Sequence, residues 1–452
     1  MNLRQLTTIN LDAEITSLTA DSRKVVPGSL FFAVKGAKVD GHDFIEIAIA
    51  NGAAAIIGER NMNVSIPYLQ SANIRHDMAI LAAKFYNRQP AKIAVITGTN
   101  GKTSTADFCR QFFELAGKDS ASIGTLGFIH GMQILEFDNT SPDPILLHQN
   151  LAKVADFAAI EGSSIGLHQH RLDGVNVTAA GWTNFTQDHL DYHGSMEEYF
   201  RTKALLFTQV MQSGVAVLNK DMPEFERIKT ICQNHQIITF GKGGDLEILK
   251  QTPTPDGQEI TVNIFGRKTD YQIELVGKFQ SENILCASGL AFACGLQDFP
   301  LEKLKPIAGR MEKAATGIYV DYAHTPDAIE TALKALRPHT SGSLRIVFGC
   351  GGDRDKTKRP LMGALAAKLA DSVIITDDNP RTEKPEAIRA EILAACPDAT
   401  EISDRKTAIQ TAITVMKKGD TLLIAGKGHE KYQIYGTEKQ YFDDVEVVKS
   451  YS

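Results

Sequence analysis

The fold is decided by one stretch of the chain, Ala94-Val95-Ile96-Thr97-Gly98-Thr99-Asn100-Gly101-Lys102-Thr103-Ser104. A β-branched strand enters a glycine-bearing turn, and the turn opens a helix-like run near Lys102. Backbone N–H groups in such a turn and at a helix N-terminus form a cradle for an anion. We expect Lys102 to neutralise the outer phosphates of a nucleotide and the Thr103 hydroxyl to ligate magnesium. The motif G-x-x-G-K-T is shorter than the common G-x-x-x-x-G-K-[ST], because Ile96 occupies the first glycine position.

The rest of the chain alternates apolar strand-like runs with amphipathic helix-like runs, which is typical of α/β layers. The 452 residues correspond to about three domains of roughly 150 residues each. Pro90 stops the helical run before the phosphate loop, and a turn near Gly309-Arg310 precedes a new strand. We therefore predict an N-terminal α/β domain at 1–88, a central P-loop-type domain with a mostly parallel sheet at 89–308, and a C-terminal Rossmann-like α/β domain at 309–452. The predicted strands are 93–96, 164–167, 179–184, 215–218, 317–321, 345–349, 372–376 and 421–424, with a β insertion at 248–276.

Composition and charge exclude several classes of protein. With 43% apolar residues, the chain is neither disordered nor collagen-like. The net charge of −6 argues against a protein that grips nucleic acid non-specifically. The six cysteines form no C-x-x-C pair, so we expect reduced, mostly buried thiols. The first residues lack the apolar core of a signal peptide, and the longest apolar run falls short of the about 20 residues that a membrane span needs. We therefore expect a cytoplasmic monomer with no membrane insertion and no nucleic-acid partner.

A second group of polar residues lies downstream of the phosphate loop. Glu161 lies at the edge of a predicted strand, and Asp188-His189 lies in a polar turn. Lys203 follows Tyr199 by four residues in a helix-like run and precedes Phe207 by four, so the three share one face. A carboxylate, an imidazole and a hydroxyl suit a divalent metal that also holds phosphates. Taken singly, Asp188-His189 could be a surface turn and Lys203 an exposed helix charge.

In order and spacing, these motifs resemble those of the Mur ligases, ATP-dependent amide-forming enzymes of peptidoglycan synthesis with folylpolyglutamate synthetase as a relative. The resemblance implies that Thr103, Glu161 and His189 ligate Mg2+ and that Lys102, Lys203, His189 and Glu161 are catalytic. Lys203 matches the lysine that family members carbamylate with CO2 to N6-carboxylysine, an anion that can hold a second magnesium. That reaction requires the neutral amine. The implied ATP-binding residues are Gly98, Thr99, Asn100, Gly101, Lys102, Thr103, Ser104, Asn283, Arg310, Asp321 and His324.

The resemblance extends to residues for a sugar-nucleotide peptide. It makes the first domain a UDP-MurNAc-binding domain, with Ser22 and the Ala37-Lys38-Val39 loop near the nucleotide. The loop Asn139-Thr140-Ser141 resembles the family's N-T-T-P loop, and Arg171 offers two-point contact to a carboxylate or pyrophosphate. Together with these, Ser163 and Gln169 would hold the muramoyl-dipeptide.

The motif Asp378-Asn379-Pro380-Arg381 follows a predicted strand. The fixed φ of Pro380 aims the next side chain, and a planar guanidinium fits a carboxylate. The motif resembles the signature of the branch that adds meso-diaminopimelate, whereas lysine-adding members lack this arginine. By this resemblance, Arg381 would pair with the distal carboxylate and Glu430 with the distal ammonium. The implied diaminopimelate residues are Arg354, Asp378, Asn379, Pro380, Arg381, Gly426 and Glu430.

The implied reaction joins UDP-MurNAc-L-Ala-D-Glu to meso-diaminopimelate with ATP, through an acyl phosphate, and closure about Gly309-Arg310 would bring the substrates together. Three alternatives remain open: a ligase of this fold that adds L-lysine or another amino acid, a folylpolyglutamate synthetase, and a non-catalytic P-loop nucleotide-binding protein. The hints toward the last are Gly162 and Ile165, which stand where the family commonly has valine and histidine.

Overall fold

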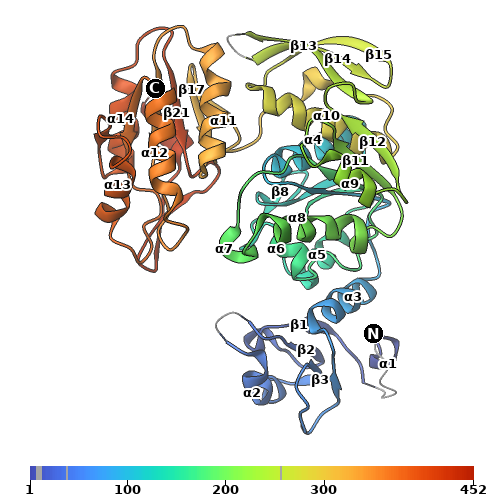
Figure 1. The fold of residues 1–452 in the computed structure, drawn as a ribbon. Coiled ribbons are helices and arrows are strands. Elements are labelled where there is room, and N and C mark those ends of the chain that lie inside the picture. The colour runs from blue at the N-terminus through green and yellow to red at the C-terminus, as the bar shows by residue number, and fades with distance from the viewer. Residues whose placement is uncertain (7–12, 37–38, 255–256, 452) are drawn as a thin grey trace.

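The computed structural model describes residues 1–6, 13–36, 39–254 and 257–451 and forms three lobes along the chain (Figure 1). The lobes contain sheets of four, eleven and six strands, and a separate two-stranded hairpin belongs to the third lobe. The predicted α/β class with mostly parallel sheets is thus confirmed, whereas the exact domain boundaries stay a prediction. None of the helices in the described residues is long and apolar enough to cross a membrane.

The first lobe is a parallel sheet in the order β1-β2-β3-β4. Its helix α3 leads to the central lobe and packs against α5 there. Asn73 caps the start of α3, because its side chain accepts the backbone N–H of His76 at 3.2 Å. The helix ends where Asn87 adopts a left-handed φ of 45°, three residues before Pro90. The elements are α1 Leu3–Leu6, β1 Ser17–Thr19, β2 Ser29–Ala33, α2 Ile45–Ala50, β3 Ala53–Gly58, β4 Tyr68–Gln70 and α3 Ile74–Tyr86.

The central lobe is built on a sheet in the order β15-β14-β13-β12-β11-β10-β5-β9-β6-β7-β8, parallel from β13 to β6. Strand β5 is buried on both faces, because its successive side chains point to opposite faces of the sheet and those from Ile93 to Thr97 are all buried. The elements are β5 Lys92–Thr97, α4 Lys102–Leu115, β6 Ser120–Gly124, β7 Gly127–His130, β8 Gln133–Leu135, α5 Pro144–Leu151, β9 Phe157–Glu161, α6 Ser164–His168, β10 Ala179–Trp182, α7 Leu190–His193, α8 Met196–Leu205, β11 Val215–Asn219, α9 Phe225–Ile231, β12 Gln236–Phe240, β13 Leu246–Thr254, β14 Gly257–Ile264, β15 Arg267–Ile273 and α10 Lys278–Ala293.

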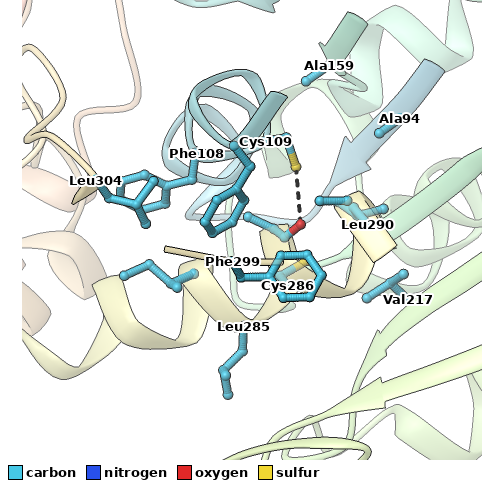
Figure 2. Packing of buried hydrophobic residues seen from close by; sticks show 14 of the residues in the cluster. Ala94, Phe108, Cys109, Ala159, Val217, Leu285, Cys286, Leu290, Phe299 and Leu304 are labelled. Carbon is cyan, nitrogen blue, oxygen red and sulfur yellow. Dashed lines mark hydrogen bonds between the residues drawn. The ribbon is translucent and has the colours of Figure 1, made fainter. Parts of the chain in front are cut away.

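One face of this sheet carries the core that holds the phosphate loop. Helices α4 and α10 pack on each other and on Ala94 of β5 (Figure 2). The Cys109 thiol of α4 donates to the backbone oxygen of Ala287 at 3.6 Å. All six cysteines of the chain are buried and unpaired, as predicted. Apolar packing against α10 and the sheet therefore fixes the position of α4, and hence of the loop before it.

The β insertion is confirmed, since β13, β14 and β15 extend the central sheet as an antiparallel edge. The predicted strand at 164–167 is wrong, because these residues form α6. The Ser163 hydroxyl accepts the backbone N–H of Gly166 at 3.0 Å, which caps a helix, and the buried strand β9 lies just before it. Helix α8 continues as a π-helical segment, Leu206–Val210, so the i+4 spacing ends before Phe207.

The third lobe has the strand order β16-β17-β21-β18-β19-β20, parallel from β17 to β20. Helices α11, α12 and α13 cover one face, and α14 and α15 cover the other. Thr325 caps α11 directly after β17, at the carboxyl edge that faces the central lobe. The elements are β16 Glu312–Ala315, β17 Ile318–Asp321, α11 Pro326–Leu336, β18 Leu344–Phe348, α12 Lys358–Leu369, β19 Ser372–Ile375, α13 Pro385–Leu393, β20 Thr400–Glu401, α14 Arg405–Thr414, β21 Thr421–Ala425, β22 Tyr432–Tyr435, β23 Glu438–Tyr441 and α15 Asp444–Tyr451.

Candidate active site

The phosphate loop runs from the end of β5 into α4. Gly98 and Gly101 have positive φ values of 143° and 83°. A Cβ atom at Gly101 would lie 2.2 Å from Asn283 Oδ1, so only glycine lets the loop approach α10 this closely. Lys102 Nζ donates to the backbone oxygens of Gly98 and Thr99 at 3.0 and 2.7 Å. The ammonium group is thus folded over the loop at the mouth of the anion cradle.

This loop opens into a cavity of about 410 Å³ between the central and third lobes. The cavity brings together residues that the sequence analysis assigns to ATP, to magnesium and to catalysis, from both lobes. Gly98 is not among its lining residues but touches Lys102 and Lys203. The predicted residues that line it are Thr99, Asn100, Gly101, Lys102, Thr103, Ser104, Thr140, Glu161, Ser163, His189, Lys203, Asn283, Arg310, Asp321 and His324.

Lys203 lines the cavity and is only 1% exposed. Its Nζ donates to the backbone oxygen of Gly98 at 2.7 Å and lies 4.4 Å from the centre of the Tyr199 ring. Burial holds the pKa of Lys203 well below its usual value, and the positive charge of Lys102 lowers it further. More of the amine is therefore neutral, and hence reactive towards CO2, than for an exposed lysine.

Glu161 and His189 lie on the same cavity from different loops. Glu161 is 1% exposed, and its carboxylate accepts the backbone N–H and the hydroxyl of Thr125 at 2.7 and 3.2 Å. His189 has a left-handed φ of 52° at the start of α7. Burial lowers the pKa of His189, although the Asp188 carboxylate at 3.5 Å opposes this effect. A neutral imidazole keeps a lone pair for a metal ion.

These donors fit a hard divalent cation that is shared with phosphate oxygens. The Thr103 hydroxyl and the Glu161 carboxylate supply oxygen ligands, which Mg2+ prefers. The Lys203 amine itself cannot ligate a cation while it is protonated, whereas a carbamate on Nζ would add two oxygens. The residues therefore fit Mg2+ directly, and a second ion only with the modified lysine.

The third lobe touches the phosphate loop directly. Arg310 Nη2 donates to Thr103 Oγ1 at 3.0 Å, and Asn100 Nδ2 donates to Asp327 Oδ2 at 2.7 Å. The same Asp327 oxygen accepts the Thr186 hydroxyl at 3.3 Å. Asp327 is not among the predicted site residues, although it stands in the first turn of α11, within the same motif (320–328) as Asp321 and His324. Its position there is the signal that could have found it.

A second cavity, of about 480 Å³, adjoins the first. Asn139 and Thr140 line it from the central lobe, and Glu430 lines it from the third. Thr125, Thr140 and Tyr322 line both cavities, so the two share a wall. The structure therefore places a predicted dipeptide loop and a predicted amino-acid residue beside the nucleotide cavity.

The other predicted diaminopimelate residues lie in three loops of the third lobe, which follow β18, β19 and β21. Arg381 has a left-handed φ of 53°, and its Nη1 donates to the backbone oxygen of Gly352 at 2.8 Å. Asn379 Nδ2 donates to Glu430 Oε2 at 2.9 Å, which ties the motif to the second cavity. Arg354 is exposed in the loop that contains Gly352. A Cβ at Gly426 would lie 2.6 Å from Asp378 Oδ2, while Pro380 is buried between the loops.

The predicted dipeptide residues of the central lobe form a hydrogen-bonded group. The Ser141 hydroxyl donates to the backbone oxygen of Glu161 at 2.8 Å and lies 3.0 Å from Ser163 Oγ. Arg171 donates to the Ser141 backbone oxygen at 2.7 Å and to Gln169 Oε1 at 2.8 Å. In the first lobe Ser22 is buried and Val39 is exposed, whereas Ala37 and Lys38 lie outside the described residues.

Family models match nearly the whole chain in three consecutive parts: the Mur ligase family catalytic domain at residues 14–91, the Mur ligase middle domain at 96–291, and the Mur ligase glutamate ligase domain at 309–428. The chain belongs to the Mur ligase family. It is 47% identical, over 96% of its length and 94% of the relative, to the UDP-N-acetylmuramoyl-L-alanyl-D-glutamate--2,6-diaminopimelate ligase of Caulobacter vibrioides. It is 44% identical to the same-named ligase of Bradyrhizobium diazoefficiens, over 96% of this chain and 94% of that one.

A solved structure of a ligase with this name matches 100% of the Mur ligase described here and 98% of its own chain, with 33% identity and a TM-score of 0.72. MurF from Thermotoga maritima, solved with ADP, shares the fold at 21% identity and a TM-score of 0.68, covering 91% of this chain and 94% of its own. These matches confirm the three-domain Mur ligase fold expected from the sequence motifs.

Gly162 and Ile165 stand beside Glu161, at the two positions where the family resemblance predicts valine and histidine. A Cβ at Gly162 would lie 3.1 Å from Val95 Cγ1, so a valine there would require the β5 side chain to shift. Ile165 is half-buried in α6. Close by, His193 Nε2 lies 3.0 Å from the Ser164 hydroxyl, so an imidazole is present at this helix although position 165 is isoleucine.

Proposed function

We propose that this chain is the ATP-dependent ligase that joins meso-diaminopimelate to UDP-MurNAc-L-Ala-D-Glu in peptidoglycan precursor synthesis. The observation that carries the proposal is the pair of adjoining cavities: one holds Lys102, Glu161 and Lys203, and the other holds Glu430. ATP binds in the first cavity. The dipeptide carboxylate reaches the shared wall, and the incoming amino acid binds on the other side.

The chain's own residues position and neutralise the reacting groups. The dipeptide carboxylate oxygen attacks the γ-phosphorus, the bond to ADP breaks, and an acyl phosphate forms. Lys102 and Arg310 stabilise the negative charge on the moving phosphoryl group. The amine of diaminopimelate then attacks the acyl carbon, loses a proton, and phosphate leaves. When bound, Mg2+ neutralises phosphate charge, with Thr103, Glu161 and His189 as its ligands.

Two residues have particular roles in this proposal: one is chemically modified, and the other selects the amino acid. Lys203 carries a carbamate formed from CO2, because its buried amine is readily neutral. Arg381 pairs with the distal carboxylate of diaminopimelate, which L-lysine lacks. The net charge of −6 argues against nucleic acid as a partner, and the buried, unpaired cysteines fit the reducing cytoplasm. We expect a monomer that works there on small molecules.

The test is a coupling assay with the purified full-length chain. Phosphate release and tripeptide product should require ATP, UDP-MurNAc-L-Ala-D-Glu and meso-diaminopimelate together, and L-lysine should substitute poorly. R381A should raise the KM for diaminopimelate about a hundredfold, equal to about 2.7 kcal/mol, with ATP binding unchanged. Equal use of L-lysine would favour the lysine-adding alternative, and absence of any turnover would favour a binding protein.

A further inference from the structure

Two imidazoles and a carboxylate converge where the first lobe meets the central lobe. His76 lies in the first turn of α3, and His170 and Asp173 follow α6. The Nδ1 atoms of His76 and His170 lie 2.6 and 2.8 Å from the same atom, Asp173 Oδ2. One ligand atom from each of the three side chains lies within 4.8 Å of the other two. We propose that this cluster binds a divalent transition metal such as Zn2+, at a site separate from the magnesium site of the active centre.

The chemistry of the donors selects the class of ion. Two imidazole nitrogens and one carboxylate oxygen suit Zn2+, Ni2+ or Cu2+, whereas Mg2+ and Ca2+ prefer oxygen ligands alone. Within residues 1–6, 13–36, 39–254 and 257–451, no second group of three histidine, cysteine or acidic side chains brings its donors this close. The cluster is therefore specific to this junction.

The present geometry needs only a small change to accept the ion. Bonds of about 2.0–2.1 Å in a tetrahedral site place neighbouring donors roughly 3.3 Å apart. To hold the ion, the two imidazole N–H protons would leave, the donors that now lie within 4.8 Å of one another would close to this spacing, and the Asp173 oxygen would move back by roughly half an ångström. The side chains of His76 and His170 are 47% and 28% exposed, so an ion can enter and water can complete the coordination.

Asn73 sets the affinity from the far side of one ring. Its Nδ2 lies 3.1 Å from His170 Nε2, and its Oδ1 accepts the backbone N–H of His76. When the metal takes Nδ1 of His170, Nε2 must carry the proton, and the amide NH2 cannot accept it. An aspartate at position 73 would accept that proton and still cap α3. In the wild type, the Asn73 NH2 group would therefore face another N–H donor when the metal is bound, which weakens the site. N73D replaces this donor with an acceptor.

The site would couple two parts of the molecule. His76 belongs to α3, the last helix of the first lobe. His170 and Asp173 flank Arg171 in the central lobe, and Arg171 contacts Gln169. A bound ion would fasten the first lobe to this segment. If the proposed function holds, metal occupancy should also lower the KM for the UDP substrate, but metal binding itself does not depend on that function.

The experiment titrates the chelator-treated, full-length protein with Zn2+ by calorimetry, in the presence of excess Mg2+. The wild type should bind Zn2+ at this site and gain thermal stability, and H76A and H170A should lose both effects. N73D should bind about tenfold more tightly, a gain that a misfolded variant cannot show. H339A is the matched control and should bind as the wild type does, because His339 Nδ1 contacts the backbone oxygen of Thr254 at 2.8 Å. Equal Zn2+ binding by the wild type and H76A, or unchanged affinity in N73D, would overturn the proposal.

Discussion

Glu383→Gln tests how two loops of the third lobe, one with Arg354 and the other with Arg381, are held together. Arg359 is completely buried and donates to Glu383 Oε1 at 2.9 Å and Oε2 at 3.1 Å, and to Glu391 at 2.8 Å. Glu383 Oε1 also accepts the backbone N–H of Asp353 at 2.6 Å. The carboxylate thus joins the loop before α12, which contains Arg354, to the loop that contains Arg381.

The substitution keeps the shape of the side chain and removes its charge. A hydrogen bond to a charged group contributes about 1.5–3 kcal/mol, and Glu391 still neutralises Arg359, so we expect a loss of about 2 kcal/mol of unfolding free energy. If about 1.4 kcal/mol of this loop ordering is required for binding, the KM for diaminopimelate rises about tenfold, with the KM for ATP unchanged.

Urea denaturation and steady-state kinetics measure the two effects. Glu330→Gln is the matched control, because Glu330 pairs with Lys334 at 2.6 Å on the surface and such pairs contribute about 0–1 kcal/mol. The reasoning is refuted if E383Q is as stable as E330Q, or if it loses stability with no change in the KM for diaminopimelate.

The same variant has a pH signature. The bond to Arg359 lowers the pKa of Glu383 from 4.5 to about 2. A carboxyl whose folded-state pKa is lowered stabilises the fold above its unfolded pKa, and this contribution is lost as the pH falls towards the folded value. The wild type should therefore lose its advantage over E383Q between about pH 4.5 and 2, which unfolding curves at several pH values would detect.

Three further predictions concern single sites. The lowered pKa of Lys203 leaves more of its amine neutral as the pH rises, and the neutral amine is the form that reacts with CO2. Bicarbonate should therefore restore activity to a CO2-depleted sample of the wild type but not to K203A; a wild type indifferent to bicarbonate would contradict carbamylation. G101A should weaken ADP binding in titrations, since φ is +83° there and a Cβ would meet Asn283 Oδ1, with a strain of about 1–3 kcal/mol; unchanged affinity would count against this role of the loop. D444N should lower the unfolding free energy by about 3–5 kcal/mol in urea, because Asp444 and Arg405 are 0% exposed and paired at 2.7 Å; a loss under about 1 kcal/mol would mean that the pair is dispensable.

Local pattern was enough to predict the phosphate loop, because strand, glycine turn and helix follow each other within the stretch from Ala94 to Ser104. It was not enough at 164–167, where a short apolar run fits a strand and a helix equally well. There the Ser163 hydroxyl stabilises a helix, because it accepts the backbone N–H of Gly166 and so caps the helix N-terminus. Segments of this length are resolved by capping contacts rather than by hydrophobic periodicity.

Contacts between lobes were beyond sequence reasoning for a different reason. Asn100 and Asp327 are 227 positions apart, and His76 and Asp173 are 97 apart. No local periodicity links such residues, since only the folded arrangement of three sheets brings them together. The family resemblance supplied the residues within each motif, but it gave no role to Asp327 and did not indicate the histidine cluster. The roles of the predicted site residues stay predictions until the assays above are done.

The wall formed by Thr125, Thr140 and Tyr322 has a consequence for inhibitor design. Because these residues face both cavities, a ligand fragment seated in one cavity ends next to a fragment seated in the other. Joining two weak fragments by a short tether across this wall would turn the second contact into an intramolecular one, at an effective concentration on the order of millimolar. Such a tethered compound would also hold the central and third lobes in one fixed arrangement, and so stop the cycle mechanically as well as by competition.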